Sequence, residues 1–534
     1  MSQTRLSLII LALAVIFGTA LRMAGTAGKK TIDPDEGISY MVATGHLGEY
    51  FGVDGQPPYG AWVEAEQWKR FLQVESRFCF KQIGYDLANY DIHPPLYFWL
   101  LHLWSLIFGI HLWTGPSLNI LISVMAILLL YRLANLILKD RVEAALAAFV
   151  WALGSAVMGV SCHARPYDLL ALCTILLTLQ TIRITDASAT AKSKDFIYMA
   201  ITSAAGAMTH YHFAIIILGC SLFMAYKLIK VKRQRLFTAL SSIVAGLVIF
   251  YLMHPHFLLS VRYQMAENQP FQFSGILPRL KAVITAFGTF FWQGMPAIYI
   301  ISPSIVFRYI YPSILIILIL FLSILYIKSR SDYQIRQDAT DRAGNYVLYF
   351  LFWTSGIIVL GYMFFLSPAH ALGPKYLSIV WPFFAFVPVL IIRVFGRFKS
   401  ILMMVLIVSQ IFFGGLDMFY MNYPDNKRPE PVSWLKESDT ILIDNVARGV
   451  LPGIIWHVPD DKLVFAADQN YLIENSAEWK SRLTDNSLYL SILLYGNTSQ
   501  RQREILDVIK QDYEVVSSSG GFWGYGSMFR LEGK

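Results

Sequence analysis

The chain has 534 residues, of which 55% are hydrophobic and 15% are charged, with a formal net charge of +8 and a mean hydropathy of +0.49. Soluble domains carry roughly 25% charged residues, whereas this sequence repeats apolar stretches near the length that crosses a bilayer. The basic residues fall in short loops between those stretches, without a basic helix or an aromatic–basic motif, which argues against a nucleic-acid partner. Composition predicts a mostly α-helical, polytopic membrane protein.

The four cysteines are too few for a disulfide scaffold. Cys162, Cys173 and Cys220 lie in or beside apolar stretches, where thiols behave as small hydrophobic groups. Cys79 lies in a polar loop, and no metal-ligand spacing joins the four. The sequence therefore predicts no cofactor, although it leaves a divalent metal open.

The first apolar stretch, residues 6–23, fits either a cleaved signal peptide or an uncleaved anchor. We favour the anchor, because the stretch is long and the chain keeps returning to the membrane. Clusters of Lys and Arg mark cytoplasmic loops, and an outgoing and a returning stretch lie between consecutive clusters. The expected spans are residues 6–23, 117–138, 142–160, 168–184, 197–208, 213–228, 236–253, 305–326, 346–366, 376–392 and 401–419. This pattern predicts about eleven spans in the plasma (inner) membrane, with the N-terminus inside and the C-terminus outside.

Two further apolar stretches do not fit as full spans. The stretch at residues 96–110 is short and includes a histidine, and the stretch at residues 282–300 is interrupted by glycine and proline. We expect both to be interfacial or re-entrant helices on the outer side. Five tryptophans in or near the first outer loop favour anchoring in the headgroup layer over sugar stacking: Trp62, Trp68, Trp99, Trp104 and Trp113.

The composition becomes more polar after about residue 423. Residues 440–444, 462–466, 488–494 and 513–517 are typical of short strands, and residues 500–511 of a helix. The predicted organisation is a transmembrane catalytic domain, residues 1–423, with a first outer loop at 25–95. A small extracytoplasmic α/β domain follows at residues 424–534.

The first outer loop begins with two acidic residues side by side, in the sequence Asp33-Pro34-Asp35-Glu36-Gly37. Asp35 or Glu36 could simply cap a helix that starts near Gly37. Paired carboxylates can also remove a proton from an attacking hydroxyl, and a low-dielectric site beside the bilayer would raise the pKa of one of them.

The same loop ends with Asp91-Ile92-His93-Pro94-Pro95. The two prolines fix the backbone and prevent a helix from running through them. His93 would then be held rigidly at the start of the following helix, either within a simple turn or as a donor to a phosphate or hydroxyl. Asp91 is a further candidate for the same site.

These features together resemble the GT-C membrane glycosyltransferases, in particular the protein O-mannosyltransferases (glycosyltransferase family 39) and the aminoarabinose transferases of lipid A. The resemblance extends over roughly the first 390 residues. Besides the acidic pair and the Asp-x-His-Pro-Pro sequence, it is carried by Gly115-Pro116-Ser117, Tyr131-Arg132-Leu133-Ala134, Ala164-Arg165-Pro166-Tyr167, Thr209-His210-Tyr211 and Lys375-Tyr376-Leu377.

The resemblance implies roles for individual residues. Asp35 matches the general base for the acceptor, and Glu36 matches its neighbour in the donor site. His93 and Arg165 match the residues that face the donor phosphate. Asp168 lies near the position of the family's second-loop acidic residue, but it follows Arg165 by three residues, a shorter gap than in the mannosyltransferases.

Later motifs add further candidates. Lys375 stands where relatives often have arginine. It would supply a positive charge, but it could not form the paired hydrogen bonds of a guanidinium. The next residue, Tyr376, is a further candidate. His210, Tyr211 and His212 lie between two expected spans. The histidine pair could bind a metal, although such residues more often line a polar cavity or cap a helix.

The implied reaction is displacement at the anomeric carbon of a polyprenyl-phosphate sugar, with inversion. Cationic side chains stabilise the leaving phosphate, and the partners are the lipid-linked donor, membrane lipids and a lipid, glycan or protein acceptor. A polytopic lipid or glycan transporter without transferase activity is the main alternative, yet the sequence lacks internal repeats and mid-membrane charges. A non-catalytic assembly or adhesion protein would leave the acidic pair and His93 without a purpose.

Overall fold

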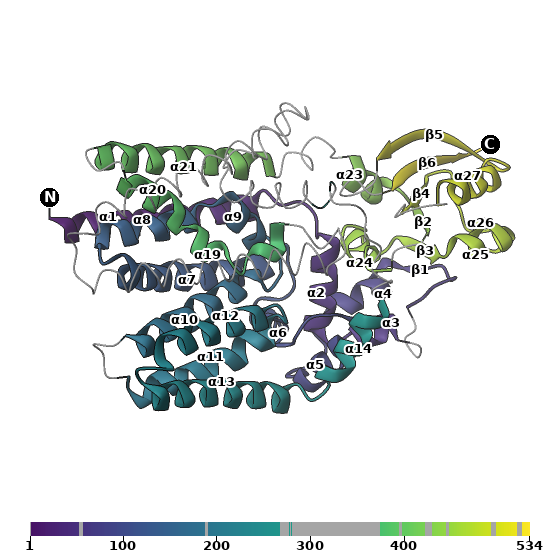
Figure 1. Cartoon of the computed structure of the whole chain (residues 1–534). Coiled ribbons are helices and arrows are strands. Elements are labelled where there is room, and N and C mark those ends of the chain that lie inside the picture. Colours follow the sequence, from purple (N-terminus) through teal and green to yellow (C-terminus); the bar gives the residue numbers. More distant parts are fainter. Residues whose placement is uncertain are drawn as a thin grey trace. The chain divides into compact units, whose positions relative to one another are not determined.

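The computed structural model describes residues 2–52, 57–186, 191–267, 277, 279, 374–394, 398–421, 430–444, 448–492, 498–520 and 526–534 (Figure 1). The expected spans 305–326 and 346–366 and the stretch 282–300 lie outside the described residues. By its contacts the chain forms two compact units. Unit 1 comprises Met1–Gly28, Asp91–Tyr97 and Gly115–Met421, and unit 2 comprises Lys29–Tyr90, Phe98–Thr114 and Asn422–Lys534. The predicted domain boundary at residue 423 stays a prediction.

Unit 1 is a bundle of helices. Its described elements are α1 (Gln3–Ala27), α7 (Thr114–Leu138), α8 (Arg141–Ala152), α9 (Ser155–Ser161), α10 (Tyr167–Thr185), α11 (Ser193–Thr209), α12 (Phe213–Leu228), α13 (Arg233–Met253), α14 (Phe257–Glu267), η5 (Pro374–Leu377), α19 (Trp381–Phe384), α20 (Phe386–Val394) and α21 (Lys399–Met421). Within the described part of the chain, five helices are long and apolar enough to cross a membrane, and a bent pair would make a sixth. The chain is therefore a multi-pass membrane protein, and the number of about eleven spans stays a prediction.

The expected span 142–160 is broken into α8 and α9, which meet at an angle of 55°. Arg22 of α1 donates from Nη1 to the carbonyl oxygen of Ala152 at 2.7 Å. The chain then turns at Gly154, the N-cap of α9. A kink requires partners for the carbonyls that leave the helical ladder, and Arg22 supplies one.

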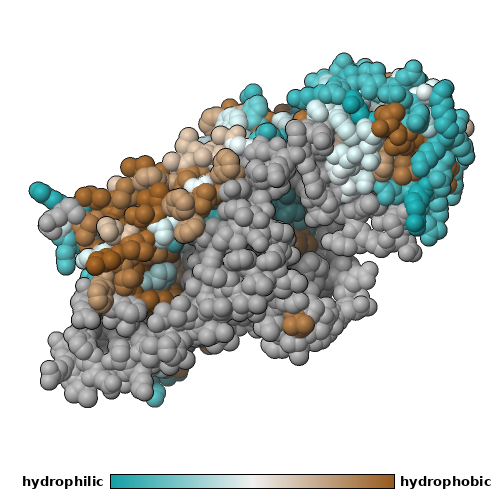
Figure 2. Space-filling model, turned by 90° about the horizontal axis from the view of Figure 1, so that it is seen from above, coloured by the Kyte–Doolittle hydropathy of each residue, from teal (hydrophilic) through white to brown (hydrophobic). Residues whose placement is uncertain are grey.

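Apolar side chains cover much of the outward surface of unit 1 that is coloured in Figure 2. On α1, Leu8 and Ile16 are 57% and 60% exposed, and on α21 Met404 and Val408 are 62% and 61% exposed. Large exposed apolar surfaces of this kind are stable when lipid covers them.

Unit 2 combines the first loop with the C-terminal region. Its helices are α2 (Pro34–Thr44), α3 (Leu47–Phe51), α4 (Ala65–Lys69), η1 (Arg70–Leu72), α5 (Phe80–Tyr90), most of α6 (Leu96–Phe108), α23 (Glu430–Glu437), α24 (Leu451–Ile455), α25 (Gln469–Glu474), α26 (Ser476–Lys480) and α27 (Thr498–Ile509). Its strands are β1 (Val63–Glu64), β2 (Thr440–Asp444), β3 (Leu463–Ala467), β4 (Ser487–Ser491), β5 (Tyr513–Gly520) and β6 (Ser527–Gly533). With 13 residues, α6 is about 20 Å long, which is too short to cross the roughly 30 Å hydrocarbon core unaided.

The six strands form one sheet in the order β1-β3-β2-β4-β6-β5. The central strands β3, β2 and β4 run parallel, and the others pair antiparallel. The small α/β arrangement predicted from the strand and helix pattern is thus present. The sequence prediction missed β6, and it missed β1, which comes from the first loop and pairs Val63 with Val464.

Apolar side chains from the sheet and its helices pack together in unit 2. The core includes Leu442 and Phe465 from the central strands, Trp479 from α26, and Ile505 and Ile509 from α27. The indole of Trp479 lies in this core and donates to the carbonyl of Leu472 at 3.0 Å, so its polar atom is satisfied.

Asp444, at the carboxyl end of β2, is fully buried and accepts four hydrogen bonds. Oδ2 accepts from Gln469 at 3.0 Å, from Tyr489 at 3.2 Å and from Ser491 at 2.6 Å, and Oδ1 accepts from the Ile492 N–H at 3.2 Å. A buried carboxylate with this many donors links the end of β2 to the end of β4 and to α25.

Replacing Asp444 with alanine should therefore destabilise the full-length protein by at least about 3 kcal/mol, because several buried donors lose their partner. Thermal unfolding of the purified protein in detergent measures this effect. Asp439→Ala is the matched control, since it removes the exposed pair with Lys462 and should change stability by less than about 1 kcal/mol. Equal effects of the two substitutions would contradict the role given to Asp444.

Candidate active site

Three predicted residues of unit 1 form a continuous chain of hydrogen bonds. Asp91 Oδ1 lies 3.0 Å from His93 Nδ1, and His93 Nε2 lies 3.2 Å from Arg165 Nη2. A guanidinium can only donate, so His93 Nε2 is the acceptor. The remaining proton of His93 must then sit on Nδ1 and point to Asp91, which makes the imidazole neutral in this geometry.

The backbone around this chain is positioned by its neighbours. Arg165 lies in the turn before α10, where its N–H donates to the His163 carbonyl at 2.8 Å. Asn119 of α7 donates from its side-chain amide to the carbonyls of His163 at 2.6 Å and Arg165 at 3.3 Å. His93 is followed by Pro94 and Pro95 before α6 begins, as the sequence predicted. Both His93 and Arg165 are buried.

Aromatic rings gather beside His93. Its ring meets that of His210 edge to face, with centroids 5.7 Å apart. The ring centroid of His210 lies 4.6 Å from that of His212 and 6.3 Å from that of Tyr167. The ring centroids of Tyr376 and His212 are 6.2 Å apart. The structure thus brings together four of the predicted residues, His93, His210, His212 and Tyr376, and places Arg165 in the same group through His93.

Burial and nearby charge set the protonation of this group. Burial alone would raise the pKa of Asp91, but His93 and then Arg165 favour the carboxylate and bring the pKa below its ordinary value. Burial, with help from His212, His93 and Arg165, holds the pKa of His210 well below 6.5. Burial also lowers the pKa of His212 to about 4. At neutral pH Asp91 is therefore an anion, and His210 and His212 are neutral.

The low pKa of His212 predicts that acid destabilises the protein. In the unfolded chain the imidazole binds a proton below about 6.5, while in the folded chain it does so only below about 4. The stability contributed by neutral His212 is thus complete above pH 6.5 and is lost as the pH falls toward 4, by roughly 2 kcal/mol at pH 5. Thermal unfolding at pH 7 and pH 5 should show a smaller drop for His212→Gln than for the wild type. The exposed His111 serves as the control, since His111→Gln should keep the full drop.

Lys375 and Tyr211 occupy different surroundings. Lys375 Nζ lies 5.5 Å from the ring centroid of Tyr376, so its charge is next to the aromatic group. The Tyr211 hydroxyl is directed to other partners, donating to Ser260 Oγ at 2.8 Å and lying 3.2 Å from His254 Nε2. Burial raises the pKa of Tyr211 to about 12, so this hydroxyl stays protonated.

Asp168 lies in a separate buried cluster of unit 1. Its Oδ1 accepts from Ser123 Oγ at 3.0 Å and from Ser161 Oγ at 3.1 Å. Ser161 in turn accepts from Arg22 Nε at 2.9 Å. Sequence analysis did not single out Arg22, although an arginine inside an apolar helix is costly and therefore a signal of function or of a buried partner.

The acidic pair of the first loop lies in unit 2, at the start of α2. Asp33 is the N-cap and Pro34 the first helical residue, so the helix starts three residues earlier than expected. Glu36 is fully buried, accepts from the Asp33 N–H at 3.0 Å and is paired with Lys29. Asp35 is half-buried on the first turn. Glu36 thus takes part in the cap of α2 and in an ion pair with Lys29, and its predicted place in the catalytic site stays a prediction.

The described residues contain no group of three or more His, Cys, Asp or Glu side chains arranged to hold a metal ion. His210 and His212 lie in the aromatic group beside His93. Whether the protein uses a divalent metal stays a prediction of the sequence alone.

Comparison with known proteins finds similarity to one family model and to several solved structures. A family model described as dolichyl-phosphate-mannose-protein mannosyltransferase matches residues 92–258. The oligosaccharyltransferase of Archaeoglobus fulgidus tethered with an acceptor peptide matches at 12% identity, covering 95% of this chain and 72% of that chain, with a TM-score of 0.51. ArnT from Cupriavidus metallidurans in the apo state matches at 13% identity, covering 99% of this chain and 98% of that chain, with a TM-score of 0.46. No curated protein matches the sequence.

The matched segment contains His93, Arg165, His210 and His212. The resemblance to GT-C membrane glycosyltransferases predicted from the sequence is therefore confirmed, and the similarity to the archaeal enzyme shows a shared fold.

Proposed function

We propose that this protein transfers a sugar from a polyprenyl-phosphate carrier to an acceptor hydroxyl at the outer face of the membrane. The observation that carries the proposal is the buried chain from Asp91 through His93 to Arg165, inside the segment that matches the mannosyltransferase family model. A buried guanidinium held by a neutral imidazole is suited to bind a phosphate.

In the proposed reaction the anomeric carbon–oxygen bond to the phosphate breaks, and its electron pair leaves with the phosphate oxygen. The acceptor oxygen forms the new bond from the opposite face, which inverts the configuration at that carbon. Arg165 and Lys375 would stabilise the charge that grows on the phosphate. Asp35 would take the hydroxyl proton, a role carried by the family resemblance.

The proposed role of His93 is to orient the guanidinium of Arg165. His93 Nε2 accepts a hydrogen bond from Arg165 Nη2 and so orients the guanidinium. The Nδ1–H of His93 donates to the carboxylate of Asp91, whose negative charge stabilises the proton on Nδ1. This arrangement is similar to that of a metal-binding histidine, which is also oriented by a carboxylate on its other nitrogen. Here the histidine contacts the guanidinium of Arg165, where such a site would have the metal. The neutral rings of His210 and His212 would add hydrogen-bonding groups without adding charge.

The proposed orientation predicts which side of the membrane each loop faces. With Cys79 replaced by serine, the remaining cysteines of the chain are buried, so single new cysteines can be labelled selectively. A membrane-impermeant thiol reagent on intact cells should label Gln500→Cys in unit 2, and it should label Lys230→Cys, in the loop between α12 and α13, only after lysis. Labelling of position 230 in intact cells, together with protection of position 500, would show that the chain has the opposite orientation to the one proposed.

The direct test of function uses membranes that contain the wild-type protein and a radiolabelled polyprenyl-phosphate sugar. We expect label to move into an acceptor fraction, with release of free polyprenyl phosphate. Movement of the intact labelled lipid across the membrane without covalent transfer would instead indicate a transporter.

A further inference from the structure

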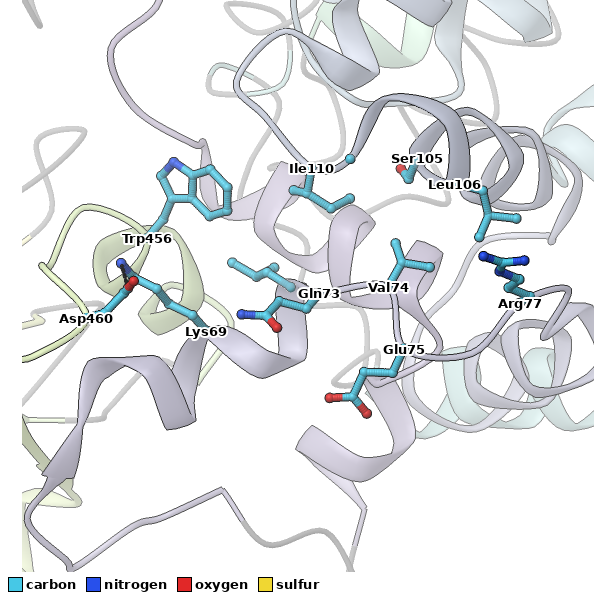
Figure 3. Close-up of a pocket in the computed structure, with 12 residues that line it drawn as sticks. Lys69, Gln73, Val74, Glu75, Arg77, Ser105, Leu106, Ile110, Trp456 and Asp460 are labelled. Atoms are coloured by element: carbon cyan, nitrogen blue, oxygen red, sulfur yellow. Dashed lines mark hydrogen bonds and ion pairs between the residues drawn. The ribbon is translucent and has the colours of Figure 1, made fainter.

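Unit 2 contains a pocket with a volume of about 690 Å³ (Figure 3). Its apolar surface comes from the loop after η1 and from α6, including Val74, Leu106 and Ile110, and the indole of Trp456. Pockets that bind small ligands typically have volumes of about 300–1,000 Å³ and combine an apolar lining with a few polar groups. The volume of this pocket lies within that range, and its lining, which is more polar than apolar, favours a polar ligand.

The charged groups that line the pocket balance. Lys69 and Arg77 contribute two positive charges, and Glu75 and Asp460 contribute two negative charges. Lys69 and Asp460 are paired at 2.6 Å, and Glu75 lies 3.4 Å from His46 Nε2. A phosphate would need a net positive site, so this pocket is suited to a neutral ligand.

The polar groups offer both donors and acceptors. Ser105 of α6 lines the pocket and is 2% exposed, and its Oγ has no hydrogen-bond partner within the described residues. A buried hydroxyl without a partner is costly unless a ligand or water completes it. Gln73 adds an amide that can donate and accept, and in Figure 3 it lies between Glu75 and the group formed by Trp456, Lys69 and Asp460.

Trp456 provides a large, partly buried apolar ring beside the Lys69–Asp460 pair (Figure 3). Sugars present alternating apolar C–H faces and hydroxyls that both donate and accept. An indole face bordered by an amide, a hydroxyl and a balanced ion pair matches that combination. A purely apolar ligand would leave these polar groups unsatisfied.

We propose that this pocket binds a neutral saccharide portion of the acceptor. The inference rests on the proposed transferase function, because it assigns the acceptor as a glycan or glycolipid. The donor phosphate is assigned to the basic group at Arg165, and the pocket in unit 2 lacks the charge to hold it.

The first test measures binding. Purified full-length protein in nanodiscs is titrated with neutral di- to tetrasaccharides of glucose and mannose, and binding is followed by saturation-transfer NMR. At least one member should bind the wild type, and Trp456→Ala should weaken it about tenfold. Gln73→Ala and Ser105→Ala, which remove smaller groups, should weaken it less. The exposed Tyr85 of α5 does not line the pocket, so Tyr85→Ala should bind as the wild type does.

The second test separates this proposal from the transfer function. In a transfer assay with envelope extract as acceptor, Trp456→Ala should raise the KM for the extract about tenfold and leave the KM for the donor unchanged. Arg165→Ala should reduce transfer by about 10²–10³-fold yet still bind the saccharide. Normal transfer without Trp456-dependent saccharide binding would overturn the pocket assignment alone. Saccharide binding without any wild-type transfer would overturn the proposed function.

Discussion

Replacing Arg165 with alanine should reduce sugar transfer by about 10²–10³-fold. This is the typical cost of removing one preorganised donor to a developing negative charge. The guanidinium is buried and held by His93 at 3.2 Å, so it is already oriented before the donor binds. Initial rates with a labelled polyprenyl-phosphate sugar, at equal amounts of folded protein, measure the loss.

Two further variants show whether the effect is specific. Arg165→Lys keeps the charge but loses the planar fork, so it should retain more activity than alanine and less than the wild type. Arg132 is exposed on α7, and Arg132→Ala should leave the rate unchanged. Wild-type transfer by Arg165→Ala would remove this residue from the phosphate site.

Asp35→Asn should lower the rate by about 10²–10⁴-fold, because an amide cannot accept the proton of the attacking hydroxyl. The substitution is nearly isosteric, and Asp35 lies on the first turn of α2, whose start is fixed by other residues. The helix should therefore persist. Donor binding, measured by competition with polyprenyl phosphate, should stay close to that of the wild type.

The neighbouring aspartate provides a matched control. Asp33 is the N-cap of α2 and accepts from the Asp35 N–H at 3.0 Å. Asparagine caps helices about as well as aspartate, so Asp33→Asn should retain both the fold and the activity. A similar loss in both variants would mean that the loop tolerates no change of charge and that Asp35 is not the base.

Local sequence rules predicted part of this structure well. The short segment at residues 440–444 was predicted as a strand, and the structure has β2 there. The Pro-Pro pair after His93 and the Ala-Arg-Pro-Tyr sequence at Arg165 were each recognised as family motifs. Their separation by 72 residues meant that only the fold could show the 3.2 Å contact between them.

Other features depend on partners that are remote in the sequence. The break between α8 and α9 involves Arg22, whose contact with Ala152 spans 130 residues, and periodicity within residues 142–160 carries no sign of it. Strand β1 has two residues, too few for an alternating pattern. The separation of Asp168 from the histidine group is equally a tertiary effect, since Ser123 and Ser161 hold its carboxylate elsewhere.

The central claim is that the guanidinium of Arg165, held by His93 and Asp91, binds the phosphate of the lipid carrier. Titration of polyprenyl monophosphate into wild-type protein and Arg165→Ala in nanodiscs, followed by native mass spectrometry, tests it without any acceptor. The wild type should bind the lipid saturably, and the variant should bind it at least about tenfold more weakly, since a charge-assisted bond to a buried cation contributes roughly 1.5–3 kcal/mol. Equal affinity in the two proteins would contradict the claim.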